Sequence, residues 1–414
     1  MEIPSNHISE GRSGSGPDVV LRITEWLSGD ECRDLTDNGL IAGLGQRLLD
    51  QGLPLDRLTL HLPTLHPMIF ARTVAWVPNE PVEILDRRHG AELSAAFAGS
   101  PLRQVMATGQ PMLVRSSEAL SGTWLELDVF RGRALREFMI VPLCRSAGPA
   151  GAAAFATTRL DGFSTAHRIV IERIAPALRT SCELRNLRRI EATLLDTYIG
   201  AATAQHILAG QIRRGEVETL EAALLLCDLR DFTSLSNRFP GDQVLKLLND
   251  YFDCVVPAIT DAGGEILKFM GDAVLAFFHG PAPSASCAAA LGAAQQALDR
   301  LHRLTTADAE LRAGVALHYG AVSYGNIGSG ARLDFTLIGP DVNLVSRIET
   351  ACARTGEELL VSSRFAGLLD RSGTRSVGQY ELKGFDAPVE LFTLRPSRRT
   401  PPHHREKVTP CGSL

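Results

Sequence analysis

The pattern of apolar and polar residues predicts a mixed α/β fold in the first half of the chain. Apolar residues recur at helical spacing between Leu40 and Leu49, which predicts a helix near the start of this region. Ser164 is placed to cap a second, longer helix. Short apolar runs separated by turn-forming residues predict strands, the last two paired as a hairpin, at 57–62, 70–77, 137–143 and 151–157. We therefore expect a flexible lead at residues 1–16 and a folded domain at residues 17–178.

A helical segment then connects this domain to the rest of the chain. Apolar residues recur at steps of mostly three and four between Ile169 and Leu195, and the polar positions between them are rich in Arg and Glu. This pattern indicates a parallel coiled coil that links two domains. The alternative is one amphipathic helix that lies on its own domain. Pro176 is expected to kink the helix or to mark its true start. We assign residues 179–215 to a helical linker.

The second half of the chain, residues 216–395, predicts the element order βαββαβ. Ala222–Cys227 is a continuous apolar run, typical of a strand that is buried on both faces. Two short strands flank Gly271 and Asp272 as a hairpin, and further strands are expected at 313–318 and 332–338. A helix with an apolar stripe lies between the first strand and the hairpin: Leu245, Leu248, Phe252, Val255 and Ile259. The order predicts an antiparallel sheet backed by helices, in an α+β protein.

Two aspartates in this region point to a metal site. Asp228 directly follows the buried strand, and Asp272 lies at the tip of the hairpin. Both carboxylates belong to strand ends of one sheet, so they can converge although they are distant in sequence. Paired hard oxygen anions suit Mg²⁺ or Mn²⁺ that bridges the phosphates of a substrate. Asp is also a common turn residue, and each aspartate alone would be ordinary in that role.

A second polar cluster follows Gly339. Asp341 is expected to cap a helix in which Val342, Val345 and Cys352 form the buried stripe. Asn343 and Arg347 are four residues apart and so share another face, where an amide and a guanidinium can hold a ribose and a phosphate. The run Gly325-x-x-Gly328-x-Gly330 lacks the Lys-Ser/Thr of a phosphate loop, and we interpret it as a hairpin turn.

Composition narrows the class of protein. The 414 residues are 45% hydrophobic and 21% charged, which predicts a globular chain of two domains. A formal net charge of -5 argues against binding nucleic acid by overall charge. No apolar run is long enough to span a membrane, and the 8 Cys are scattered without a Cys-x-x-Cys pair, so we expect a cytoplasmic protein with reduced thiols. The histidines of the first domain lack ligand-like spacing and are expected at the surface or hydrogen-bonded: His61, His66, His89 and His167.

The order of elements in the first domain, with Val141-Pro142-Leu143 before a strand of small residues, resembles a GAF-type sensory domain. That resemblance implies either a site for an unknown small ligand or a role in dimerisation alone. The basic tail at residues 396–414 shows no periodicity, and we expect it to be disordered.

The second domain resembles the catalytic domain of class III nucleotidyl cyclases. The resemblance rests on four stretches: Cys227–Thr233, Lys268–Phe277, Phe335–Arg347 and Glu381–Phe385. It implies a ferredoxin-like domain in which Asp228, Asp272 and the Leu229 carbonyl bind two Mg²⁺ or Mn²⁺ ions per active site. Asn343 and Arg347 match the transition-state residues, and Lys268 with Thr336 matches the pair that reads adenine. Lys383 matches a phosphate-binding lysine, and Phe232 also belongs to the substrate site.

The resemblance implies an adenylate cyclase that converts ATP to 3′,5′-cyclic AMP and pyrophosphate. Its active sites would lie at a head-to-tail homodimer interface, with the metal ligands from one protomer and the base, ribose and phosphate contacts from the other. Asp231 departs from the family at a position where Gly is common, and so do Pro340 and Asp341 before Val-Asn. Three alternatives stay open: a guanylate cyclase, a diguanylate cyclase, and a nucleotide-binding regulatory protein with weak or no activity.

Overall fold

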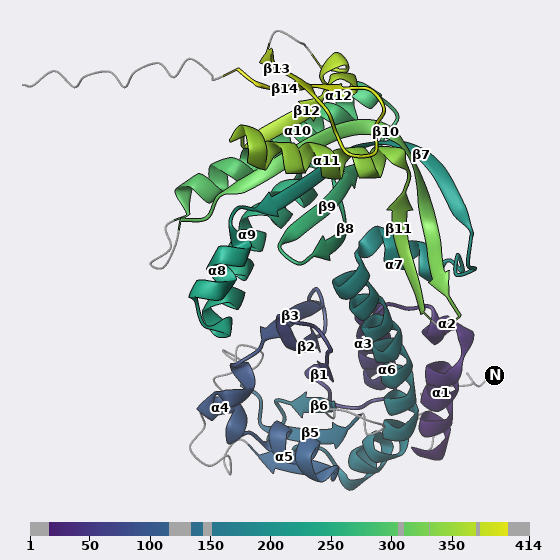
Figure 1. The fold of residues 1–414 in the computed structure, drawn as a ribbon. Helices are drawn as coiled ribbons and strands as arrows, with labels where there is room; N and C mark the ends of the chain where they lie inside the picture. The colour runs from purple at the N-terminus through teal and green to yellow at the C-terminus, as the bar shows by residue number, and fades with distance from the viewer. Residues whose placement is uncertain are drawn as a thin grey trace, which may run out of the picture. The chain divides into compact units, whose positions relative to one another are not determined.

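The chain forms two compact units, Met1–Tyr198 and Ile199–Leu414 (Figure 1). The computed structural model describes residues 16–115, 134–143, 151–304, 310–330, 332–369 and 373–395. Most of the predicted lead and the whole predicted tail lie outside these residues, and Gly16 begins the first helix. No helix of the described residues is long and apolar enough to span a membrane.

The N-terminal unit is built on a six-stranded antiparallel sheet with the order β3-β2-β1-β6-β5-β4. The predicted hairpin is confirmed, because β5 and β6 pair along their length. The two edge strands were not predicted, since β3 is largely charged and β4 is only four residues long. The strands are β1 (Arg57–Pro63), β2 (Ile69–Trp76), β3 (Glu83–Arg88), β4 (Met112–Arg115), β5 (Glu137–Pro142) and β6 (Ala152–Thr157).

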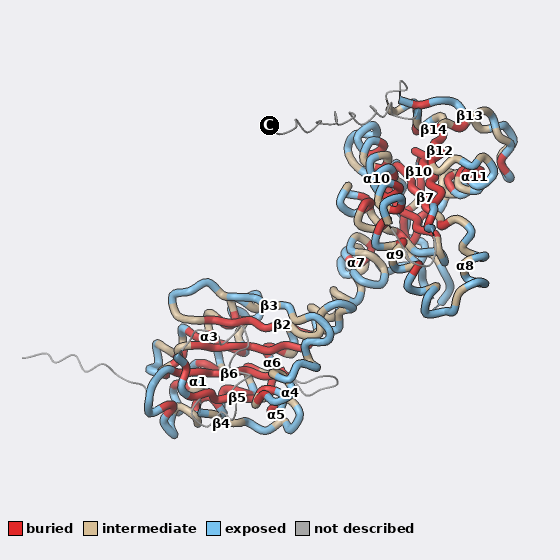
Figure 2. The backbone as a smooth tube through the Cα atoms, turned by 90° about the vertical axis from the view of Figure 1, so that its left-hand side faces the viewer, coloured by how far each residue is buried: buried red, intermediate tan, exposed pale blue. Residues whose placement is uncertain are grey.

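Helices cover both faces of this sheet. The larger core lies between one face and the helices α1 (Gly16–Ser28), α3 (Asp37–Asp50) and α6 (Thr165–Ile199), with the short α2 (Asp30–Arg33) beside them. A smaller core lies on the other face, under α5 (Pro101–Thr108), which follows the short helices η1 (Ala91–Leu93) and α4 (Ala95–Ala98). Because both faces are covered, every residue of the central strand β1 is buried (Figure 2).

Strand β1 carries polar residues on its second face. Leu58, Leu60 and Leu62 belong to the larger core, so the alternation of a strand turns Arg57, Thr59 and His61 to the opposite side. His61 Nδ1 shares a hydrogen bond with Thr73 Oγ1 at 3.2 Å, and its buried Nε2 has no hydrogen-bond partner among the described residues. The prediction of a surface or fully hydrogen-bonded histidine is therefore wrong for His61. Burial, with the nearby Arg87 and Arg57, lowers the pKa of His61 to about 3.

Helix α6 packs on the core of the N-terminal unit along its first half and ends at Ile199, one residue past this unit. The Oγ of Ser164 accepts from His167 N at 3.2 Å, which confirms the predicted cap. The helix buries side chains from Val170 to Asn186, so its first half lies on its own domain, as the alternative interpretation held. Pro176 lies inside the helix and does not mark its start. Leu184, Leu187 and Leu194 are exposed on the rest of the helix, where a coiled coil stays a prediction.

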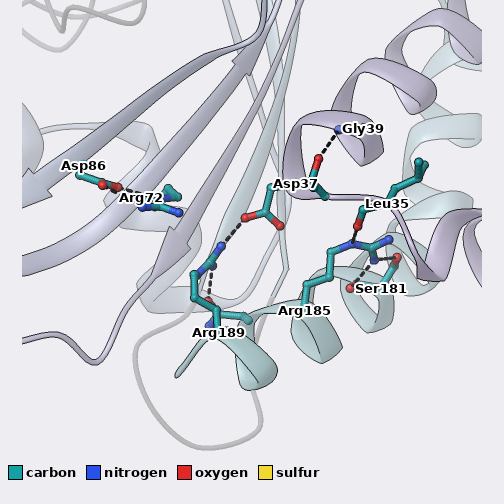
Figure 3. Close-up of polar contacts among 10 residues, drawn as sticks. Leu35, Asp37, Gly39, Arg72, Asp86, Ser181, Arg185 and Arg189 are labelled. Carbon is teal, nitrogen blue, oxygen red and sulfur yellow. Dashed lines mark hydrogen bonds and ion pairs between the residues drawn. The ribbon is translucent and has the colours of Figure 1, made fainter. Parts of the chain in front are cut away.

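Polar contacts hold α6 to the turn between α2 and α3 (Figure 3). Arg185 Nε donates to the Leu35 carbonyl at 3.2 Å, Nη2 donates to the Cys32 carbonyl, and Nη1 donates to Ser181 Oγ at 2.7 Å. One turn later, Arg189 pairs with Asp37, the first residue of α3. These contacts tie the last turns of α6 that pack on the unit to the loop before α3.

The C-terminal unit contains an eight-stranded sheet with the order β13-β14-β12-β10-β7-β9-β8, and β11 pairs with β10 outside this path. All pairs are antiparallel except β10 with β12. The glycine-rich run ends β10 and leads into β11, which confirms the hairpin interpretation. The strands are β7 (Val217–Leu229), β8 (Glu265–Met270), β9 (Ala273–Phe278), β10 (Ala313–Ser329), β11 (Arg332–Ile338), β12 (Leu359–Ser362), β13 (Thr374–Tyr380) and β14 (Val389–Leu394).

Two cores sandwich the central strand β7 of this sheet. Its odd-numbered residues, from Ala223 to Leu229, face α9 (Gly241–Asp261) and α10 (Pro283–Arg303). Its even-numbered residues, from Ala222 to Leu226, share the other core with α11 (Pro340–Thr355). The prediction of a strand buried on both faces is confirmed. The remaining helices are α7 (Ala201–Leu208), α8 (Phe232–Arg238) and α12 (Ser363–Gly367).

The buried stripe of α9 differs from the prediction at one end. Leu245 is 62% exposed, whereas Leu247, Tyr251, Val255 and Ile259 are buried. The helix therefore turns a different first residue to the core than the sequence spacing suggested. A period of three to four residues fits more than one face when a helix has apolar residues at adjacent positions, such as Leu247 and Leu248.

Candidate functional site

The two predicted aspartates lie together at one end of the central strands. Asp228 is the second-last residue of β7, and strand alternation turns it to the α11 side of the sheet. Asp272 lies in the turn between β8 and β9, and β9 pairs with β7 beside Asp228, with Cys227 opposite Val274. The two side chains are within hydrogen-bonding reach of each other. The arrangement therefore brings two carboxylates to one point.

The electrostatics of this point favour a bound cation. Burial raises the pKa of the Asp228 carboxyl to about 7, and the charges of Asp272 and then Glu349 act in the same direction. A hydrogen bond with the Leu229 backbone opposes the shift without cancelling it. Burial also raises the pKa of Glu349, against the effect of Arg230. Two crowded, half-buried carboxylates are disfavoured in the ionised state unless a positive charge lies between them.

The donor set fits a hard divalent cation that is only partly held by protein. Carboxylate oxygens are the ligands that Mg²⁺ and Mn²⁺ prefer, and such ions often take their other ligands from water and substrate phosphates. Among the residues that the structure describes, no group of three or more His, Cys, Asp and Glu is placed to hold a metal ion. The pair Asp228 and Asp272 therefore suits an ion that is completed by a phosphate-bearing ligand.

Lys268 is joined to β11, the strand that carries Thr336, by a residue that the sequence analysis did not identify. Lys268 on β8 places Nζ 2.7 Å from Asp334 Oδ2 on β11. Asp334 and Thr336 are two residues apart on β11, so they lie on the same face of the strand. Thr336 is buried, and the Lys268 side chain is 28% exposed. The alternation of Asp334 and Thr336 within a predicted strand was the available signal for Asp334.

Asn343 and Arg347 lie one turn apart on α11, with Asn343 exposed and Arg347 half-buried. Within the described parts of the chain, neither side chain makes a hydrogen bond or an ion pair, and none links them to Asp228 or Asp272. Their polar groups are thus available to a ligand. Among the described residues, no hydrogen bond or ion pair therefore joins the Asn343–Arg347 pair to the two carboxylates.

The prediction that Asp341 caps α11 is wrong. The N-cap residue is Gly339, and Asp341 is the second residue of the helix. Its carboxylate accepts hydrogen bonds from strand β10 instead, from His318 Nε2 at 2.9 Å and from Ala321 N at 2.8 Å. Val345 and Cys352 are buried as predicted, whereas Val342 is only partly buried.

Three other predicted site residues lie near strand or helix ends. Phe232 begins α8 and packs partly buried against the core of α9 and α10. Leu229 ends β7 next to Asp228. Lys383 is exposed in the connection between β13 and β14. No hydrogen bond or ion pair of the described residues joins Lys383 to the carboxylate pair.

Comparison with known proteins agrees with the likeness seen in the sequence. Residues 217–396 match the family described as the adenylate and guanylate cyclase catalytic domain. The chain is 34% identical over 194 residues to an adenylate cyclase of Anabaena cylindrica, covering 44% of this chain and 38% of that protein. It is 27% identical over 182 residues to adenylate cyclase 1 of Rhizobium meliloti, covering 42% of this chain and 27% of that protein. The likeness to cyclase catalytic domains therefore falls within the C-terminal unit.

Solved structures with similar chains include the adenylyl cyclase CyaB from P. aeruginosa, at 29% identity and a TM-score of 0.39, covering 44% of this chain and 98% of that one. A bacterial light-regulated adenylyl cyclase has 24% identity and a TM-score of 0.46, covering 53% of this chain and 64% of that one. This chain spans well under half the length of the curated relatives named above.

Proposed function

We propose that the protein is an adenylate cyclase that converts ATP to 3′,5′-cyclic AMP and pyrophosphate. The observation that carries the proposal is the convergence of Asp228 and Asp272 inside the matched catalytic domain. Sequence identity of 34% to a curated adenylate cyclase supports the same activity. The C-terminal strand order β10-β7-β9-β8 supports the expected ferredoxin-like arrangement, and the six-stranded N-terminal sheet supports a GAF-like sensory domain.

The proposed chemistry needs no protein nucleophile. Two Mg²⁺ or Mn²⁺ ions, held by Asp228, Asp272 and the Leu229 carbonyl, would activate the ribose 3′-hydroxyl and neutralise phosphate charge. Arg347 stabilises the negative charge that develops on the α-phosphoryl group, as a planar guanidinium can donate two hydrogen bonds to it. Asn343 orients the ribose so that its 3′-oxygen faces the α-phosphorus in line. Lys383 binds a terminal phosphate, and Phe232 lines the substrate site.

Base selection rests on Lys268 and Thr336. Lys268 can only donate hydrogen bonds, and Thr336 can both donate and accept, so together they suit the ring nitrogen and amine of adenine. The ion pair with Asp334 joins the Lys268 ammonium group to β11, the strand that carries Thr336. A guanylate cyclase would need a carboxylate or similar acceptor to read guanine, and neither Lys268 nor Thr336 supplies a carboxylate. Adenine is therefore the favoured base.

The proposal includes a homodimer with two shared active sites. It is motivated by the lack, among the described residues, of any hydrogen bond or ion pair between the carboxylate pair and the Asn343–Arg347 pair. The proposed sensor would act through α6, which starts in the N-terminal core and continues to Ile199. A cytoplasmic location agrees with the buried free cysteines of both units.

The test is product identity from equimolar ATP and GTP with Mn²⁺. The wild-type full chain should form mainly cyclic AMP. Lys268→Glu with Thr336→Cys should lose most of this activity, and Asp334→Asn belongs in the same variant, since the introduced glutamate would otherwise face the Asp334 carboxylate. Gain of cyclic GMP should be partial. Wild-type protein that makes mainly cyclic GMP, or a triple variant with undiminished preference for ATP, would refute this base selection.

A further inference from the structure

A chain of hydrogen bonds, buried at His318 and Ser362 and partly exposed at Asp341, lies beneath the start of α11 in the C-terminal unit. His318 on β10 is 3% exposed, and its Nδ1 lies 2.7 Å from Ser362 Oγ at the end of β12. Its Nε2 lies 2.9 Å from Asp341 Oδ1, and the other oxygen of Asp341 accepts from Ala321 N at 2.8 Å. Asp341 therefore joins the first turn of α11 to strand β10 through both of its carboxylate oxygens.

One arrangement of protons satisfies every group in this chain. Ser362 Oγ accepts from Phe365 N at 3.2 Å, so its hydroxyl hydrogen is free to donate to His318 Nδ1. His318 then carries its proton on Nε2 and donates it to Asp341. Burial lowers the pKa of His318, against the opposing effect of Asp341, which favours this neutral ring. The network is held in place by its buried centre, because displacing Asp341 or Ser362 would leave a nitrogen of the buried His318 ring unpaired.

The first turn of α11 depends on this contact because it has no side-chain cap. Gly339 at the N-cap position offers no side-chain acceptor, and its φ of 147° lies outside the range that other residues readily adopt. The bond from Asn343 N to Gly339 O, at 3.3 Å, is long for a helical bond. Asn343 thus belongs to a turn that would fray without an outside anchor, and Arg347 follows one turn later.

Gly320 makes the approach of Asp341 possible. A Cβ atom at residue 320 would lie 2.2 Å from Asp341 Cγ and 2.6 Å from Asp341 Cβ. Contacts of this length do not occur between real side chains, so any larger residue at 320 would push the start of α11 away from β10. Glycine, which has no Cβ, is the residue type at position 320 that leaves room for the Asp341 side chain.

We infer that Asp341 and His318 form a clamp that positions the first turn of α11, and with it Asn343 and Arg347, for cyclisation. Asp341 is a positioning residue, since its carboxylate is used up by His318 and Ala321 and is not aimed at substrate. The inference rests on the proposed cyclase function. It also accounts for the departure from the family pattern at Pro340 and Asp341, because the acidic group serves the fold of the helix start.

The experiment compares Asp341→Ala, Asp341→Asn and Gly320→Ala with wild-type full chain. Its control is Asp242→Ala, because Asp242 is likewise the second residue of a helix, α9, but is exposed and makes no hydrogen bond or ion pair among the described residues. We expect Asp341→Ala to lower kcat by about tenfold to a hundredfold, with little change in KM, because small misplacements cost that much in rate. Asp341→Asn should lie between, since its amide places an acceptor at only one of the two carboxylate oxygen positions and an NH2 donor at the other.

Backbone hydrogen exchange of residues 341–347 gives a readout that does not need activity. Exchange there should rise in Asp341→Ala and Gly320→Ala and stay unchanged in Asp242→Ala. If the wild type is active, a kcat of Asp341→Ala equal to that of wild type would overturn the clamp. A loss of kcat in Asp242→Ala as large as that in Asp341→Ala would overturn it too. A wild type without cyclase activity would overturn the proposed function instead. In that case unchanged exchange at 341–347 in Asp341→Ala would also refute the clamp, and raised exchange would retain it as a structural anchor.

Discussion

At the scale of single residues, Asp228 shows how a site can oppose the stability of its own fold. The carboxylate is half-buried and faces the charges of Asp272 and Glu349, so ionising it is unfavourable in the folded state. The group is of no use to the hydrophobic core around it. Its position is explained if binding of a cation offsets the free energy that ionising Asp228 costs. Carboxylates with strongly shifted pKa values often lie at functional sites for this reason.

We predict that Asp228→Ala abolishes metal-dependent cyclase activity without lowering the stability of the chain measured in EDTA. Removing one of two repelling carboxylates relieves the repulsion, so the melting temperature in EDTA should stay the same or rise. In wild type, added Mn²⁺ should raise the melting temperature, and the variant should lose that increase. The control is Asp242→Ala, which should keep both activity and the response to Mn²⁺. Near-normal turnover of Asp228→Ala at saturating Mn²⁺ would contradict the metal assignment.

His61 makes the stability of the N-terminal unit depend on pH. Its pKa is about 3 in the folded state and about 6.5 when unfolded, so below pH 6.5 the unfolded chain binds a proton that the folded chain does not. The free energy of unfolding should therefore fall by about 2 kcal/mol between pH 7 and pH 5 from this residue alone. The free energy of unfolding of His61→Gln should fall less between pH 7 and pH 5. The control is His89→Gln, at an exposed position, whose free energy of unfolding should fall as much as that of wild type.

Tryptophan fluorescence can follow this unit within the full chain, since all 3 tryptophans precede residue 199: Trp26, Trp76 and Trp124. Urea unfolding at pH 7 and pH 5 then yields the change in free energy for each variant. An identical change in wild type and His61→Gln would show that His61 does not titrate between the folded and unfolded states as proposed.

At the scale of elements, periodicity predicted the long helices and the buried strands but not their partners. The apolar steps between Ile169 and Leu195 are compatible with a coiled coil and with a helix lying on a core, because both use spacings of three and four. In the structure, the side chains that α6 buries lie between Val170 and Asn186. Its exposed leucines begin at Leu184, on another face of the helix, and continue toward its end. Edge strands such as β3 escaped prediction because their charged residues carry no apolar period.

We predict that Arg185 anchors α6 to the N-terminal unit. Arg185→Met would leave the Cys32 and Leu35 carbonyls without their charged donor, and we expect a loss of about 1–3 kcal/mol in the free energy of unfolding of this unit. The matched control is Arg188→Met, since Arg188 lies on the same helix, is exposed and makes no hydrogen bond or ion pair among the described residues. Tryptophan fluorescence during urea unfolding measures both. Equal stability of the two variants would mean that the contacts of Arg185 contribute nothing.

At the scale of the whole molecule, the sequence predicted which residues would meet only where sheet geometry leaves little choice. Asp228 and Asp272 end neighbouring strands of one sheet, so their approach could be anticipated from the hairpin between β8 and β9. The pairing of Lys268 with Asp334 could not, because it joins two strands that are not hydrogen-bonded neighbours. The prediction that Asp341 caps α11 was wrong because its hydrogen-bond partners, His318 and Ala321 on β10, are distant in sequence.

The proposed shared sites predict that two inactive variants restore each other. Asp228→Ala removes a metal ligand, and Arg347→Ala removes the transition-state cation, so each homodimer should be inactive. In a mixed dimer with sites built from both protomers, one site carries both defects and the other carries neither. Random exchange of subunits gives roughly half mixed dimers, each with one intact site, and so about a quarter of wild-type turnover.

If both groups served one site within a single chain, every site would keep a defect and mixing would restore nothing. Exchange itself can be verified with differently labelled protomers, so that absence of activity in proven mixed dimers would refute the shared sites.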